Sequence, residues 1–169
     1  MVNVKLVCFL LFLTAGVGVV KGSHVFQGFN KSDFYDVMKS GGIEEINNQL
    51  VIIGDSFIHE KEAYQGALLM KKAGLVKKPK DKLKFFKTGR IKFETALLSD
   101  SNNVEYHFLR LSIQEHAPKI VKYHGQLEKD SGYIKLNFKN LSSIVQQAIL
   151  DYSKTSKVLH PRDFQHLVE

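Results

Sequence analysis

The chain has 169 residues, with 24 Lys or Arg against 17 Asp or Glu, and a formal net charge of +7. Its single cysteine, Cys8, excludes a disulfide within the chain, so buried apolar surface has to hold the fold together. A chain of this length can form one such core, and we expect one globular domain.

Residues 1–22 have the pattern of a signal peptide. An uncharged run, Leu6–Val20, follows one lysine, and Val20 and Gly22 are suitable at positions −3 and −1 for cleavage before Ser23. The alternative is an uncleaved membrane anchor, but the fifteen-residue run is short for a bilayer span, which takes about 20 residues. We therefore predict export to the periplasm or cell envelope, a flexible start over residues 23–30, and no transmembrane span in the mature chain.

Helical periodicity dominates residues 31–155, and we expect an all-α domain there. Apolar residues recur at spacings of three and four, and capping residues, glycines and prolines divide the pattern into helices. Even "QLVIIG", at residues 49–54, continues the helical spacing. The tail, residues 156–169, is predicted to add one short turn after Pro161. The seven predicted helices cover about residues 32–40, 43–52, 57–73, 79–98, 102–117, 124–139 and 143–154.

The helix predicted over residues 102–117 has two opposed apolar faces when its residues are placed about 100° apart. Two polar strips separate these faces, so the helix is expected to pack between two layers of other helices. The two apolar sets are Val104, Phe108 and Leu111 on one side, and Tyr106, Leu109, Ile113 and Ala117 on the other.

Small residues at Ala63, Gly66 and Ala67 are expected to let a neighbouring helix approach closely. By contrast, the helix after Pro79 has one apolar face, which predicts an outer position in the domain. The residues that we expect in the core include Phe57, Leu68, Phe86, Leu97, Phe108, Leu111 and Ile113.

The segment "ALLSDSNNVEYHFLRLSI" resembles the junction between two tetratricopeptide repeats, in which an Asn-containing turn is followed by an acid and an aromatic residue. The usual proline of that turn is absent, and no second copy occurs at a period of about 34 residues. More broadly, "EAYQGALLMKKAG", "KLKFFKTGRIKFETAL" and "NNVEYHFLRLSIQEHAPKIVKY" resemble an uncharacterised family of exported bacterial helical proteins. These resemblances imply a right-handed, tetratricopeptide-like stack of six to seven helices in antiparallel hairpins, and they imply no catalytic residues.

One polar strip of the same helix contains His107, Arg110 and Gln114, at spacings of three and four. The favoured interpretation is structural, with Arg110 pairing to an acid such as Glu62 or Glu94 on a neighbouring helix. The alternative is a recognition strip in a groove, where the arginine fork would grip a carboxylate of a peptide or small ligand.

The positive charge is concentrated between Lys71 and Lys92, where ten Lys or Arg accompany one acid, Asp81. Phe85 and Phe86 lie among them, a mixture also found at nucleic-acid surfaces. Nucleic acid is not favoured, because an exported protein seldom meets it and lysine is poor at bidentate recognition. A solvated basic elbow remains one interpretation, and contact with an anionic envelope surface or an acidic protein is the other. The candidate contact residues are Lys77, Lys78, Lys80, Lys84 and Lys87.

Catalytic and cofactor motifs are sparse. "HEKEA" begins like a zinc-binding helix but has Ala63 where the second histidine would stand, and no Gly-x-Ser-x-Gly elbow or glycine-rich phosphate loop occurs. We predict no catalytic residue, metal or cofactor, and no particular oligomeric state. The chain is interpreted as an exported binding or scaffold module. The alternative is a small exported hydrolase, which a pocket holding His107 or His116 beside a carboxylate would favour.

Overall fold

The computed structural model describes residues 28–165, and the predicted signal peptide lies outside them. This part of the chain is all-α, as predicted, with seven α-helices and no strand between residues 28 and 165. None of these helices is both long enough and apolar enough to cross a bilayer. The elements are α1 (Lys31–Ser40), α2 (Ile43–Asp55), α3 (Lys61–Leu75), α4 (Pro79–Ser99), α5 (Val104–His116), α6 (Leu127–Asn137) and α7 (Ser143–Ser153), with short 3-10 turns η1 (Lys119–Val121), η2 (Phe138–Asn140) and η3 (Pro161–Asp163).

Local capping sets several helix starts. The side chain of Asn30 caps α1, because its Oδ1 accepts from the backbone N–H of Ser32 at 2.8 Å. Asn103 caps α5 in the same way, through the N–H of Tyr106 at 3.3 Å. Pro79 occupies the first position of α4, where its missing N–H costs no hydrogen bond.

Helix α3 begins at Lys61, later than the predicted start at Phe57. The Lys61 ammonium donates to the carbonyl oxygens of Gly54 and Ser56, so it satisfies groups at the end of α2, and a turn separates the two helices. Phe57 lies in this turn with 105% relative exposure, and its predicted place in the core is therefore wrong. The spacing of the apolar residues from Phe57 to Tyr64 fits a continuous helix. It could not reveal a turn that is closed by a lysine side chain.

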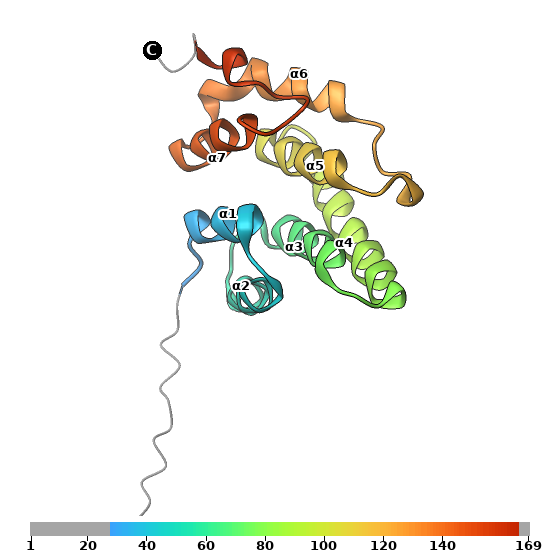
Figure 1. The fold of residues 1–169 in the computed structure, drawn as a ribbon. Helices are drawn as coiled ribbons and strands as arrows, with labels where there is room; N and C mark the ends of the chain where they lie inside the picture. The colour runs from blue at the N-terminus through green and yellow to red at the C-terminus, as the bar shows by residue number, and fades with distance from the viewer. Residues whose placement is uncertain (1–27, 166–169) are drawn as a thin grey trace, which may run out of the picture.

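Helix α5 lies in the middle of the molecule (Figure 1). It contacts α3 on one side and both α6 and α7 on the other, while α3 also packs against α2 and α4. Both apolar faces of α5 are covered, as expected of a helix between two layers. The other expected core residues are buried as well: Leu68, Phe86, Leu97, Phe108, Leu111 and Ile113.

The predicted tail contributes to the same core. Leu159 and Phe164 have no exposed surface, and the Phe164 ring lies 4.7 Å from that of Phe138, measured between ring centroids. The predicted turn after Pro161 is present as η3. The last part of the described chain therefore packs over α6 and η2.

A buried carboxylate ties α5 to α1 and α3. Glu105 is 6% exposed, and its oxygens accept hydrogen bonds from the hydroxyls of Tyr35 at 2.8 Å and Tyr64 at 2.7 Å and from the Lys31 ammonium at 2.8 Å. Burial, and then the charge of Glu105, raise the pKa of both tyrosines well above its usual value. Both phenols therefore remain protonated donors at neutral pH, and the buried charge is fully partnered.

Helices α3 and α4 run antiparallel and cross closely at two glycines. Lys92 of α4 reaches Glu62 near the start of α3, and Lys72 near the end of α3 lies over Phe85. Between these contacts, a Cβ on Gly66 would lie 2.7 Å from the carbonyl oxygen of Gly89, and one on Gly89 would lie 2.6 Å from that of Gly66. The backbones therefore touch, which extends the prediction that Gly66 permits a close approach.

We predict that Gly89→Ala lowers the free energy of unfolding by about 1–3 kcal/mol, because the added methyl group meets backbone atoms of α3 that cannot move independently. Gly74→Ala is the matched control, since the same exchange on α3 points into open space. That control should raise the free energy of unfolding by about 0.5–1 kcal/mol. Urea unfolding followed by circular dichroism measures both, and equal effects of the two substitutions would contradict a tight crossing.

Candidate functional site

The five candidate lysines are exposed on the turn after α3 and on the first half of α4. Within residues 28–165 none of their side chains forms an ion pair or a hydrogen bond. Lys80, Lys84 and Lys87 are spaced by four and three residues, so they lie on one side of α4. We refer to this set as the lysine face: Lys77, Lys78, Lys80, Lys84 and Lys87.

Other cations of the basic segment have contacts within the fold. The Lys92 ammonium lies 2.8 Å from a carboxylate oxygen of Glu62, and Lys72 donates to the Asn47 side chain at 2.6 Å while covering the Phe85 ring at 4.4 Å. Burial lowers the pKa of Lys71. The charge available to a partner therefore lies on the lysine face, together with Lys82 and Arg90, which are also exposed.

The aromatic residues of the segment are not presented for stacking with bases. Phe86 is 8% exposed and packs edge-on against Tyr123, while Phe85 is half-buried beneath Lys72. Single-stranded nucleic acids are usually bound by exposed aromatic rings beside positive charge. The geometry therefore gives no specific support to nucleic-acid binding.

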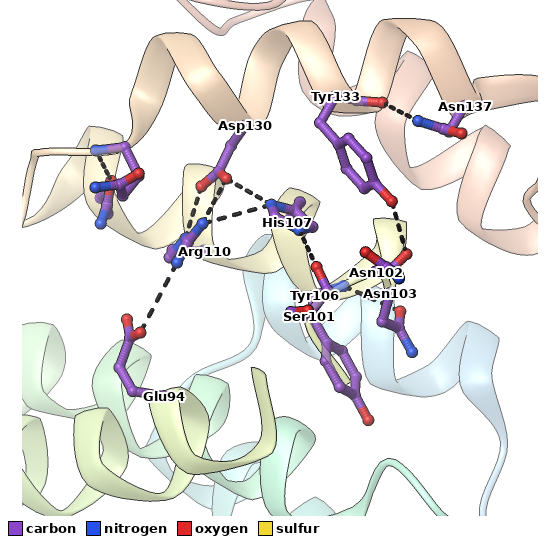
Figure 2. A network of polar contacts seen from close by, with 12 residues as sticks. Glu94, Ser101, Asn102, Asn103, Tyr106, His107, Arg110, Asp130, Tyr133 and Asn137 are labelled. Carbon is purple, nitrogen blue, oxygen red and sulfur yellow. Dashed lines mark hydrogen bonds and ion pairs between the residues drawn. The ribbon is translucent and has the colours of Figure 1, made fainter. Parts of the chain in front are cut away.

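Arg110 is held by a partner that was not predicted. Its Nε and Nη2 donate to the two carboxylate oxygens of Asp130 on α6 at 2.8 and 2.6 Å, and Asp130 is fully buried (Figure 2). Of the two expected partners, Glu94 lies 3.8 Å from Nη1, whereas Glu62 pairs with Lys92 instead. Asp130 could have been noticed in the sequence, because it shares a helix face with Ile134, which is also fully buried.

His107 contacts the same carboxylate. Its Nδ1 lies 2.6 Å from Asp130 Oδ1, and its Nε2 lies 2.8 Å from the carbonyl oxygen of Ser101 (Figure 2). Both neighbours offer an oxygen atom that can accept a hydrogen bond. His107 and Arg110 therefore link α5 to α6, which agrees with the structural interpretation of the strip.

The electrostatics of Asp130 follow from this arrangement. Burial alone raises the pKa of its carboxyl group, but hydrogen bonds from Arg110 and His107 outweigh burial and hold the pKa below its usual value. A carboxylate with a depressed folded-state pKa stabilises the fold at pH values above its unfolded-state pKa. That contribution is lost as the pH falls through the folded-state pKa.

Of the two histidines considered for a hydrolase, His107 lies beside the carboxylate of Asp130 but does not line the pocket described below. Both ring nitrogens of His107 are engaged, and that side chain is only 6% exposed. His116 is exposed, with Nδ1 facing the carbonyl oxygen of Ser112, while neighbouring Glu115 accepts from the Tyr152 hydroxyl. In the described residues no group of three His, Cys, Asp or Glu side chains is placed to hold a metal.

A pocket of about 320 Å³ opens between α4, α5 and the segment that follows η1. It divides the predicted strip, because Arg110 and Gln114 line it whereas His107 does not. Of its other members, sequence reasoning named only Glu94, as a possible partner of Arg110, because the lining comes from segments that meet only in the folded chain. The lining residues are Arg90, Glu94, Arg110, Gln114, Lys122, Tyr123, Gly125 and Gln126.

Replacing Asp130 by asparagine should destabilise the fold by about 3–5 kcal/mol at pH 7, because Arg110 loses its buried counter-charge. The loss of stability that protonation of Asp130 causes at low pH should be absent from this variant. Asp151→Asn is the control, since Asp151 pairs with Lys154 and Lys39 at the surface and its loss should cost less than about 1 kcal/mol. Urea unfolding at pH 7 and pH 3 tests both variants, and equal losses would show that Asp130 is dispensable.

Comparisons with protein-family models, with curated proteins and with solved structures find no match for this chain. The resemblances to tetratricopeptide repeats and to exported bacterial helical proteins therefore remain predictions. Function has to be inferred from the residues of this chain alone.

Proposed function

We propose that this chain is an exported binding or scaffold module that contacts an anionic partner through the lysine face. The partner is an anionic component of the cell envelope or an acidic protein. The observation that carries the proposal is that all five lysines are exposed and make no ion pair within residues 28–165. Export and location in the periplasm or envelope are part of this proposal, and they rest on the pattern of residues 1–22.

The position of the lysines on α4 strengthens the proposal. The N-terminus of a helix carries partial positive charge, which favours acids and disfavours lysine in the first turn. Lys77, Lys78 and Lys80 surround the start of α4, and Asp81 is the only acid in its first turn. Lysine at these positions therefore does not stabilise the helix. Residues that depart from the usual preferences of a helix are expected where a function requires them.

The proposed scaffold is a tetratricopeptide-like, right-handed stack of helical hairpins. The antiparallel pairing of α3 with α4 supports this arrangement, as does the packing of α5 against both α3 and α6. In such a stack an outer helix presents one face to solvent, and α4 has its lysines on such a face. Partner contact there would use the surface of the stack and would need no catalytic group.

Replacing Lys80, Lys84 and Lys87 together by glutamate should abolish binding to anionic vesicles and to a polyanion resin. Binding of the parent protein to the vesicles and to the resin should weaken steeply between low and moderate salt, because the Debye length is about 8 Å at physiological ionic strength. The variant should be folded and at least as stable as the parent. Exposed substitutions change stability by about 0.5 kcal/mol or less, and an acid in the first turn of α4 is favourable.

A variant with Lys129, Lys139 and Lys157 changed to glutamate provides the matched control. These lysines are also exposed, and the net charge changes by the same amount, but they lie outside α4. The control should retain most of the binding. If both triple variants lose binding equally, overall charge is responsible and the lysine face is not a site. If neither loses it, the lysines are only a solvated surface.

A further inference from the structure

The pocket beside Arg110 has a firmly held wall. Tyr123 packs edge-on against Phe86, and its hydroxyl donates to a carboxylate oxygen of Glu94. Three residues further along the chain, the backbone N–H of Gln126 donates to Gln114 Oε1 at 3.1 Å. The segment after η1 is thus bonded to both α4 and α5, and the pocket between them is part of the fold rather than a gap beneath a loose loop.

Two donors that line this pocket have no hydrogen-bond acceptor within residues 28–165. Gln114 is 2% exposed, and because its Oε1 accepts from Gln126, its amide nitrogen is left with no hydrogen bond within residues 28–165. Arg110 uses Nε and Nη2 for Asp130, while Nη1 is 3.8 Å from the nearest oxygen of Glu94, too far for a hydrogen bond. Both donors line the pocket, so an acceptor that entered it could bind to them.

The charge around the pocket favours an anion. Arg90 and Lys122 are exposed cations, and the Arg90 guanidinium is held over the Tyr123 ring at 4.8 Å from its centroid. Glu94 is the one acid among the lining residues, and its carboxylate already accepts from Tyr123. Arg90 and Lys122 therefore leave the lining positively charged, because Asp130 offsets the charge of Arg110 and Glu94 is the one acid in the lining.

Lys122 ends η1 in a left-handed backbone conformation, and its N–H donates to the carbonyl oxygen of Lys119. Its φ of 49° is the only positive value for a non-glycine residue in the described part of the chain. Lysine adopts this left-handed conformation at an energetic cost that glycine would avoid. Strained residues of this kind are concentrated at binding sites, and this one places a cation at the mouth of the pocket.

We propose that this pocket binds a small organic anion through its carboxylate group. Gln114 and Arg110 Nη1 would donate to the carboxylate from inside, and Arg90 and Lys122 would supply positive charge at the entrance. A carboxylate offers about four acceptor sites in a plane, which suits an amide and a guanidinium side by side. A volume of about 320 Å³ is at the lower end for ligand pockets and fits a small molecule rather than a peptide.

This site is separate from the lysine face and does not depend on the proposed function. Succinate is the probe, with inorganic phosphate and sodium chloride at equal ionic strength as comparisons. In ¹H–¹⁵N spectra of the purified protein, succinate should shift the side-chain amide signal of Gln114 and the backbone signal of Gly125 in a saturable manner. Shifts no larger than those caused by chloride would overturn the site, and equal saturable binding of phosphate would overturn its assignment to carboxylates.

Two substitutions test the residues. Gln114→Glu keeps the oxygen that accepts from Gln126 but replaces the free donor by a charged acceptor, so succinate binding should be lost. Lys122→Gly removes a cation and relieves the positive φ, so it should weaken binding about tenfold while raising the thermal midpoint. Unchanged affinity in Lys122→Gly would contradict the proposal even if Gln114→Glu fails to fold.

The variant with Lys80, Lys84 and Lys87 changed to glutamate distinguishes the two proposals. It should lose the polyanion binding that the parent shows at low salt, and at physiological salt it should retain succinate binding, because the pocket residues are intact and distant charges are screened. Loss of succinate binding in that variant would mean that the pocket does not act as an independent site.

Discussion

Buried charge on both sides of the central helix determines how the other helices are placed. Glu105 can be buried only because Tyr35, Tyr64 and Lys31 supply hydrogen-bond donors from α1 and α3. On the other side of α5, Arg110 requires the carboxylate of Asp130 from α6. An unpartnered charge in either place would cost several kcal/mol, so a shift of α5 along either neighbour would be strongly opposed. Apolar packing alone tolerates such shifts much better, because it is not directional.

The two proposed sites use positive charge in different ways. The lysine face carries hydrated ammonium groups on an exposed surface, where attraction acts over a distance but salt weakens it. The pocket holds a guanidinium and an amide whose positions are fixed by Asp130 and Gln126, so its selectivity would come from short-range geometry. Arg90 follows Lys87 by one turn of α4, and the two sites therefore share a helix although they share no residue.

Features that depend on local sequence were predictable. The seven helices, the two covered faces of α5 and the exposure of the lysines follow from periodicity and charge within single segments. Contacts between segments were harder to predict. The partner of Arg110 is Asp130, twenty residues away, because the chain turns back after η1, and no spacing rule describes that turn. Phe57 was misplaced because Lys61 closes the preceding helix through its side chain, which apolar spacing cannot reveal. The members of the pocket come together for the same non-local reason.

The contact between Gly66 and Gly89 also holds α4 against α3 at one point, near the middle of α4. From Gly89 to Pro79 the helix extends about 15 Å, at about 1.5 Å per residue, and this arm carries Lys80, Lys84 and Lys87. In the other direction the helix extends equally far, from Gly89 to Ser99, and this half carries Arg90 and Glu94, which line the pocket. A side chain added at this contact would force the two backbones apart and would displace both halves of α4 at once. Substitutions at these two glycines would therefore alter the spacing of charges far from the point of change, and their effects on ligand binding would have a purely geometric origin.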